Sequence, residues 1–168
     1  NTSGCTGLIT TFTDLSGTDG LNNITNWQWH FGDGVIQDYT APPFQHTYNT
    51  AGIFNVKMVI TDASGCKDSL TRTNLITATD PVPAFVVDTL TCPGATITFT
   101  NLSTPAGLTS TWDFGDGNTS ALTSPTHSYA ATGQYTIKLF VQDAIGCTDS
   151  LVLQNHIRVA LPVPGFTM

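Results

Sequence analysis

The feature that most constrains the fold is the six-residue segment WDFGDG at residues 112–117, which has an earlier version, WHFGDG, at residues 29–34. In Trp-x-Phe the two aromatic side chains lie on one face of an extended strand, which makes that face the one packed in a core. Gly-Asp-Gly then ends the strand, because glycine admits positive φ and aspartate can bond its own following backbone. Each copy therefore predicts a buried aromatic strand that runs into a tight turn.

Most of the remaining chain repeats as well, so it is read as two copies of one unit. The matched pairs of segments are residues 46–48 and 127–129, 52–54 and 133–135, 62–66 and 143–147, 68–70 and 149–151, and 81–85 and 162–166. We expect a first domain at residues 1–80, which lacks its own first strand, and a second at residues 81–161. Residues 162–168 then form an orphan first strand of a following unit.

Composition and spacing indicate an all-β chain. Only 10% of the residues are charged, whereas 15 are Gly and 9 are Pro, which favours strands and turns over helices. In the second copy the expected strands cover residues 84–87, 96–100, 112–114, 127–129, 135–141 and 150–159, with a loop or short strand near residues 124–125. About seven short strands with regular turn signals predict two tandem immunoglobulin-like β-sandwich domains, with an all-β barrel as the lesser alternative.

The net charge of −7 argues against nucleic acid or an anionic membrane surface as a partner. No apolar run approaches the roughly 18–20 residues that span a bilayer, so no membrane span is expected. No signal peptide opens the sequence.

Three ordered motifs give the chain a family resemblance. They are W-x-F-G-D-G, then P-x-H-x-Y, then G-x-Y/F-x-V/I-x-L-x-V-x-D; the second copy carries all three, and the first has Phe44 in place of the motif proline. On these residues the chain resembles tandem PKD (polycystic-kidney-disease) domains. The C-x-G and G-C segments are similar to versions in large Bacteroidetes cell-surface proteins, gliding-motility adhesins among them. The resemblance implies β-sandwiches that act as extracellular spacers, interaction modules or accessory domains of secreted hydrolases, without catalysis of their own.

The chemistry-bearing residues of the motifs are interpreted as structural. Asp33 and Asp116 are candidate calcium ligands, but a turn-forming role is favoured because calcium needs six to eight oxygens. The histidines lack a nucleophile motif, which argues against an enzyme, and no other cofactor is expected. Trp27, outside the repeat, is a weak candidate for an exposed, sugar-stacking aromatic. The structural motif residues are Trp29, Phe31, Asp33, His46 and Tyr48 in the first copy, and Trp112, Phe114, Asp116, His127 and Tyr129 in the second.

The four cysteines form no C-x-x-C pair, which favours structural disulfides and an oxidising compartment over a zinc site. Spacing alone suggests one bridge within each domain. In a sandwich, however, the first and last turns that carry these cysteines lie at opposite ends, about 23 Å apart, whereas bridged Cα atoms lie within about 7 Å. For a head-to-tail tandem we therefore predict an inter-domain bridge, Cys5–Cys147, with Cys66 and Cys92 joined to neighbouring units.

These features predict an extracellular or cell-surface structural repeat that forms a rod, stalk or filament, with neighbouring copies of the same repeat, and surface glycans or proteins, as partners. Its terminal segment, Pro162, Val163, Pro164, Gly165 and Phe166, is a candidate for β-strand addition to the next subunit. Ser69, Thr89 and Ser150 match the Asp-Ser/Thr-aliphatic pattern of O-glycosylation in Bacteroidetes. The alternative is a carbohydrate- or protein-binding accessory region of a secreted hydrolase.

Overall fold

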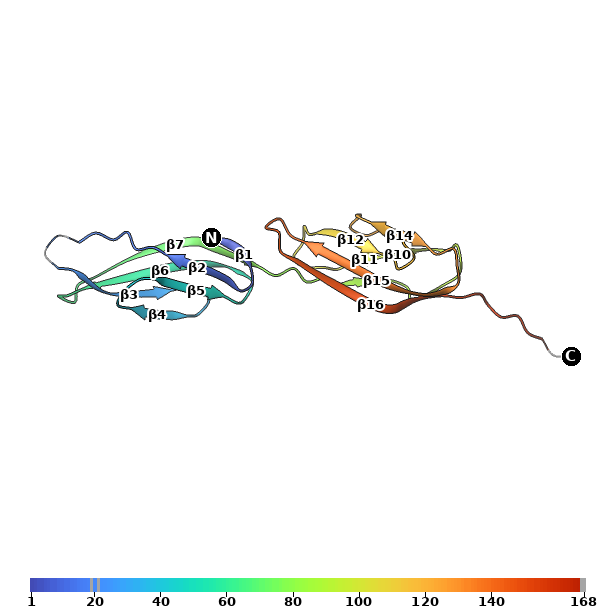
Figure 1. Cartoon of the computed structure of the whole chain (residues 1–168), viewed down its shortest axis with the longest axis horizontal. Helices are drawn as coiled ribbons and strands as arrows, with labels where there is room; N and C mark the ends of the chain where they lie inside the picture. Colours follow the sequence, from blue (N-terminus) through green and yellow to red (C-terminus); the bar gives the residue numbers. More distant parts are fainter. Residues whose placement is uncertain (19, 21, 167–168) are drawn as a thin grey trace. The chain divides into compact units, whose positions relative to one another are not determined.

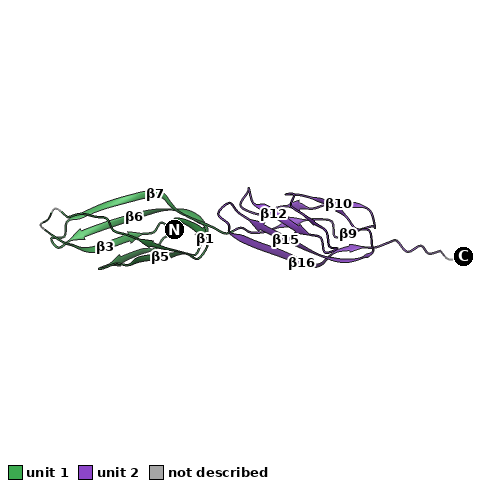
Figure 2. Cartoon of the chain, turned by 45° about the horizontal axis from the view of Figure 1, so that its top comes forward, with its two compact units in different colours: residues 1–80 green, residues 81–168 purple. Residues whose placement is uncertain are grey.

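All regular elements are strands in the computed structural model, which describes residues 1–18, 20 and 22–166. The chain divides into two compact units, Asn1–Asp80 and Pro81–Met168 (Figures 1 and 2). No helix that could cross a membrane is found in the described part of the chain.

Unit 1 contains a five-stranded sheet in the order β1-β7-β6-β3-β4. Its strands are β1 (Ser3–Cys5), β7 (Lys67–Thr79), β6 (Gly52–Asp62), β3 (Ile24–His30) and β4 (Ile36–Tyr39). The second sheet pairs β2 (Leu8–Phe12) with β5 (Phe44–Tyr48) in antiparallel register. The Trp-x-Phe segment lies on β3 and just beyond it, within the larger sheet.

Unit 2 repeats this plan with a five-stranded sheet in the order β13-β12-β15-β16-β9. Its strands are β13 (Thr119–Ser120), β12 (Thr109–Asp113), β15 (Gly133–Gln142), β16 (Thr148–Val159) and β9 (Leu90–Thr91). The other layer consists of β10 (Thr96–Thr98) with β14 (Thr126–Ser128), and β11 (Thr100–Asn101) with β8 (Phe85–Val86). The expected fold class, all-β with two immunoglobulin-like sandwiches, is confirmed.

Each unit has its own aromatic core between the two layers. In unit 2, Trp112 and Phe99 are fully buried and pack with Phe85 and Phe114. In unit 1, Trp29 packs with Phe12 and Phe44 in the same way. The repeated Trp strand therefore supplies the centre of both cores.

The units differ in their first strand. In unit 2, β8 pairs with β11, and Phe85 of β8 closes the core over Trp112 at a centroid distance of 5.1 Å. Within the described residues of unit 1, β2 pairs with β5 and with no strand that corresponds to β8. One edge of the unit 1 core is therefore left without this cover.

Candidate functional site

The Gly-Asp-Gly turn brings the end of the Trp strand close to the neighbouring strand. Gly32 and Gly115 have φ of 88° and 79°. A Cβ atom on Gly115 would lie 3.0 Å from the backbone nitrogen of Thr136 and closer still to its carbonyl oxygen, and Gly32 meets Asn55 in the same way. The first glycine of the motif is therefore required both by its backbone conformation and by the space available.

The aspartate of each turn uses both carboxylate oxygens. Asp116 Oδ1 accepts a hydrogen bond from the backbone N–H of Asn118 at 3.1 Å, which closes the turn. Its Oδ2 lies 2.8 Å from Nε2 of His127 on β14, in the opposite layer. In unit 1, Asp33 Oδ2 lies 2.6 Å from His46 Nε2 in the same arrangement. The Asp–His pair therefore ties the turn after the Trp strand to the facing layer.

The histidine is also held by aromatic rings. His127 stacks on Phe114, with ring centroids 4.2 Å apart and planes 6° from parallel, and meets Tyr129 edge-on at 4.7 Å. The Tyr129 hydroxyl donates a hydrogen bond to the backbone carbonyl of Phe114 at 3.1 Å. Unit 1 repeats the bond from Tyr48 to its own Trp-x-Phe carbonyl, also at 3.1 Å. These four side chains are here called the turn lock: Asp33, His46, Tyr48 and Phe31 in unit 1, and Asp116, His127, Tyr129 and Phe114 in unit 2.

The electrostatics of the lock agree with a structural role. Burial raises the pKa of Asp116, but hydrogen bonds from His127 and Asn118 outweigh burial, so the pKa lies below its ordinary value. Burial also raises the pKa of the Tyr129 hydroxyl, and the nearby Asp116 charge adds to the effect. The carboxylate is therefore charged and the phenol neutral at neutral pH, the states in which they accept and donate these bonds.

The turn-lock groups are occupied by one another rather than facing a substrate. In residues 1–18, 20 and 22–166, no group of three or more His, Cys, Asp or Glu side chains is placed to hold a metal ion. The candidate calcium ligands Asp33 and Asp116 each use one oxygen for a backbone N–H and the other for a histidine.

The three tryptophans have different surroundings. Trp112 donates its Nε1–H to the carbonyl of Leu122 at 3.0 Å, whereas the buried Nε1 of Trp29 has no hydrogen-bond partner among the described residues. Trp27 is half-buried, packs on Phe44 and donates to Asp14 at 2.6 Å. Trp27 is thus anchored in the unit rather than presented as a free aromatic platform.

The four cysteines are in two different states, and the three glycosylation candidates are all exposed. Cys5 and Cys147 are disulfide-bonded, and Cys66 and Cys92 are exposed free thiols. The inter-domain pairing and the links to neighbouring units remain predictions. The three glycosylation candidates, Ser69, Thr89 and Ser150, are exposed in their units.

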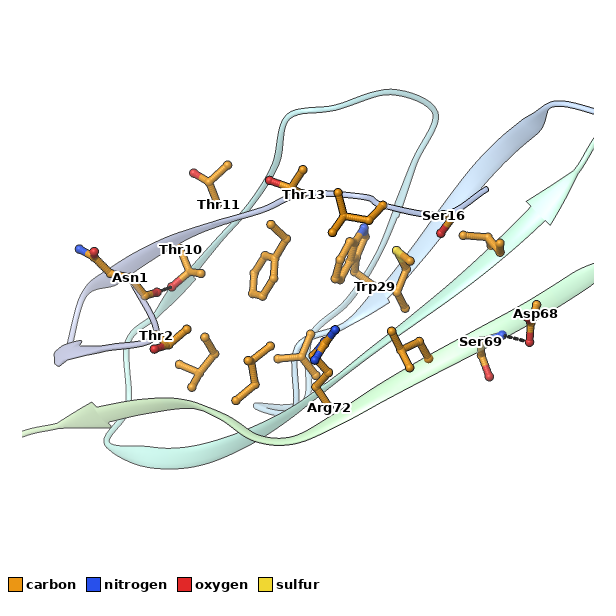
Figure 3. A pocket seen from close by; sticks show the side chains of 18 residues that line it. Asn1, Thr2, Thr10, Thr11, Thr13, Ser16, Trp29, Asp68, Ser69 and Arg72 are labelled. Atoms are coloured by element: carbon orange, nitrogen blue, oxygen red, sulfur yellow. Dashed lines mark hydrogen bonds between the residues drawn. The ribbon is translucent and has the colours of Figure 1, made fainter. Parts of the chain in front are cut away.

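An open groove lies along unit 1 where the first strand is missing (Figure 3). Its volume is about 520 Å³, and Trp29 and Arg72 are among the side chains that line it. The apolar part of its lining includes Phe12, Trp29, Val56, Met58, Ile60 and Ile76. The sequence interpretation predicted the missing first strand, but not the volume or the lining of the groove.

The terminal segment proposed for strand addition leaves unit 2 after β16 as an extended trace without strand pairing in its described part, residues 161–166 (Figure 1). Val163 is 94% exposed and Phe166 is 93% exposed. Neither side chain belongs to the buried core of unit 2. Within the described residues, the groove and this tail are thus two exposed apolar features.

Sequence reasoning identified the residues of the turn lock but not their partnership. The signal was present, because an Asp in the Gly-Asp-Gly turn and a His in the His-x-Tyr segment occur together in both copies. The groove had a signal too, since the first copy lacks the Pro-x-Pro-x-Phe segment that the second copy has at residues 81–85.

Comparison with known proteins agrees with this architecture. The family model described as PKD domain matches residues 1–78 and 78–159. The chain is 30% identical to human Polycystin-1 over 169 aligned residues, which cover 83% of this chain and 4% of that protein. It is 46% identical to a microbial collagenase of Vibrio alginolyticus over 59 residues, 33% of this chain and 7% of the collagenase.

A metalloprotease of Vibrio cholerae, Pre-pro-metalloprotease PrtV, is 28% identical over 130 residues, which are 75% of this chain and 14% of the protease. Among solved structures, the PKD1 domain of Vibrio anguillarum Epp has 32% identity and a TM-score of 0.42, covering 49% of this chain and 98% of that domain. The chain spans only a small part of the curated relatives it matches. With the family model matched twice along it, the chain belongs to the PKD domain family and carries two domains of it in tandem.

Proposed function

We propose that this chain is a non-catalytic structural module of an extracellular protein, serving as part of a rod, stalk or filament. The observation that carries the proposal is the turn lock. In both units the Asp, His and Tyr side chains that an enzyme would direct at a substrate instead join the two layers of the sandwich.

The cysteines support an extracellular setting and a role in bearing load. A disulfide persists in oxidising compartments, and Cys5 and Cys147 are in that form. A bridge between them would hold the two domains in one orientation, whereas a linker alone leaves domains free to reorient. The exposed thiols of Cys66 and Cys92 would then be available to join neighbouring units.

The partners we propose are neighbouring copies of the same repeat, joined by addition of the terminal strand, and surface glycans or proteins at the tip of the array. We extend this proposal to a cell-surface location, as in the Bacteroidetes adhesins that the C-x-G and G-C segments resemble. Glycosylation at Ser69, Thr89 and Ser150 would add polar mass to exposed positions without disturbing either core.

The second candidate is an accessory region of a secreted hydrolase. It is favoured by the relatives, which include a collagenase and a metalloprotease in which the matched region is a small part of the whole. In that case the chain would bind the substrate of a neighbouring catalytic domain or hold that domain at a distance.

Electron microscopy of the purified chain under non-reducing conditions separates the two candidates. The structural proposal predicts fibres or rods with a regular repeat of two domains per chain. Isolated particles at every concentration, together with sedimentation of the chain on insoluble collagen or polysaccharide, would contradict it and favour the accessory role.

A further inference from the structure

The unit 1 groove and the tail after β16 are complementary, and unit 2 contains the completed version of the same pair. In unit 2, Phe85 closes the core at ring-centroid distances of 5.1 Å from Trp112 and 6.4 Å from Phe99. Their counterparts, Trp29 and Phe12, line the unit 1 groove. From this template we infer that the groove is the binding site for residues 162–166 of a second copy of the chain, an inference that rests on the proposed structural role.

Burial shows that the groove is an incomplete core rather than a surface depression. Leu139 and Val141 of unit 2 are fully buried, at 0% exposure. At the matching positions of unit 1, Met58 and Ile60 are only half-buried. Both are among the groove-lining residues, so an apolar side chain placed there would remove apolar surface from water, as Phe85 does in unit 2.

The backbone edge that would receive the donor is already formed. In unit 2 the turn after β11 is closed by Ser103 N–H donating to Asn101 Oδ1 at 2.9 Å, and the N–H of Leu102, between them, donates to the carbonyl of Ala84 at 2.7 Å. In unit 1, Ser16 N–H donates to Asp14 Oδ1 at 2.8 Å, the same turn. The intervening residue, Leu15, occupies the position that Leu102 has in unit 2, so its N–H is the counterpart of the one that donates to Ala84.

The pattern of N–H groups in the tail fits this edge. In the unit 2 template, Val82 donates to Thr104 O at 2.7 Å and Ala84 donates to Ser103 Oγ at 3.0 Å, while the alternate positions are prolines without an N–H. The tail repeats this order as Pro162, Val163, Pro164, Gly165. The donors needed for the ladder are present, and each proline falls where no donor is needed.

The register also brings Phe166 to the position of Phe85, and the segment that follows the first strand is bonded in the same way in both units. In unit 2 the first strand leads into Thr89, whose carbonyl accepts from Arg158 N–H at 2.8 Å. In unit 1 the carbonyl of Thr2 accepts from Thr77 N–H at 2.9 Å. The segment 162–166 has the same length as the segment 81–85, so in this register Phe166 takes the position of Phe85. Prolines also restrict the free tail to extended conformations, which lowers the entropy lost on docking.

The test separates donor and acceptor into two chains. A donor-only chain carries Leu15→Pro, which removes the N–H of the accepting edge at a turn position where proline is favoured. A second donor-only chain, Leu70→Asp, places a charge in the groove wall at an already exposed residue. An acceptor-only chain lacks residues 162–168. Light scattering should show each variant as a monomer and a donor-only plus acceptor-only mixture as a one-to-one dimer.

Phe166→Ala in the donor should weaken the dimer by about 30-fold or more, as expected for loss of a buried aromatic anchor. The matched control is Leu161→Ala, because Leu161 is 65% exposed and lies just outside the donor segment. A mixture that stays monomeric with both donor-only chains, or a dimer that survives Phe166→Ala unchanged, would overturn the inference. Fibres that form in microscopy without such dimers would leave the structural proposal standing and refute only this docking.

Discussion

The two glycines of the WDFGDG turn allow the requirement for a close backbone approach to be measured apart from the requirement for positive φ. Gly117 has φ of 91° and nothing within 4 Å of the position of a Cβ atom, so Gly117→Ala carries only the cost of the left-handed backbone. That cost is about 1–2 kcal/mol. Gly115→Ala carries the same cost and in addition forces a methyl group against the backbone of Thr136.

Overpacking of this kind costs about 1–3 kcal/mol, so the total for Gly115→Ala is about 2–5 kcal/mol. For a domain of 60–100 residues, 1 kcal/mol lowers the melting temperature by roughly 4–8 °C. Scanning calorimetry of the whole chain should therefore show the unit 2 transition lowered by about 10 °C more in Gly115→Ala than in Gly117→Ala. The unit 1 transition should stay in place.

Gly32→Ala and Gly34→Ala provide the matched experiment in unit 1, because Gly32 meets the backbone of Asn55 and Gly34 has open space. The same ranking should appear there. Equal losses for the two glycines of either turn would show that the close approach does not exist in solution, and the tight packing at the end of the Trp strand would be refuted.

Three further predictions concern the turn lock and the disulfide. Because the pKa of Asp116 is lowered in the folded state, its carboxylate stabilises unit 2 above its ordinary pKa, and this stabilisation is lost as the pH falls through the folded pKa. Urea unfolding at pH 7 and near pH 3 should therefore show a smaller free energy of unfolding of unit 2 in acid, and Asp116→Asn should reduce this difference. Tyr129→Phe should cost about 1–3 kcal/mol in urea unfolding, because a buried backbone carbonyl loses its donor; no change would mean that water replaces the hydroxyl. Non-reducing peptide mapping should recover Cys5 joined to Cys147, whereas a Cys92–Cys147 peptide would contradict the predicted bridge.

Much of the fold was predictable because it depends on short local patterns that occur twice. Trp-x-Phe followed by Gly-Asp-Gly specifies a strand, its buried face and its end without knowledge of the rest of the chain. The boundaries were less predictable: the strand expected at residues 112–114 is β12 at Thr109–Asp113, since cross-strand pairing with β15 extends it towards its N-terminus.

The site was predictable only in part. The sequence indicates that His127 and Asp116 are structural, but their bond crosses between the two layers, and such a contact depends on how the layers pack. The groove posed a different problem. The repeat indicates that the first copy lacks the strand that carries Phe85 in the second. Which side chains of β2, β3, β6 and β7 line the resulting gap depends on how these strands pack, and only the folded unit shows it.

If unit 1 is completed by another copy, two domains of one sequence family play different parts in the chain. Unit 2 contains its own first strand and keeps a fully buried Trp112. On this inference the unit 1 groove binds the tail of another copy, and binding would couple the stability of unit 1 to assembly by mass action. A higher protein concentration should then raise the melting temperature of unit 1, measured by calorimetry, and leave that of unit 2 unchanged.

Strand donation to unit 1 is tested most directly by amide hydrogen exchange at Leu15, with Leu102 as the internal reference. In the assembled chain the Leu15 N–H should be protected to a degree approaching that of Leu102, whose N–H already donates to the first strand of unit 2. Phe166→Ala should remove the protection at Leu15 and leave Leu102 unaffected. Fast exchange at Leu15 under conditions in which the chain forms fibres would contradict completion of unit 1 by a donated strand.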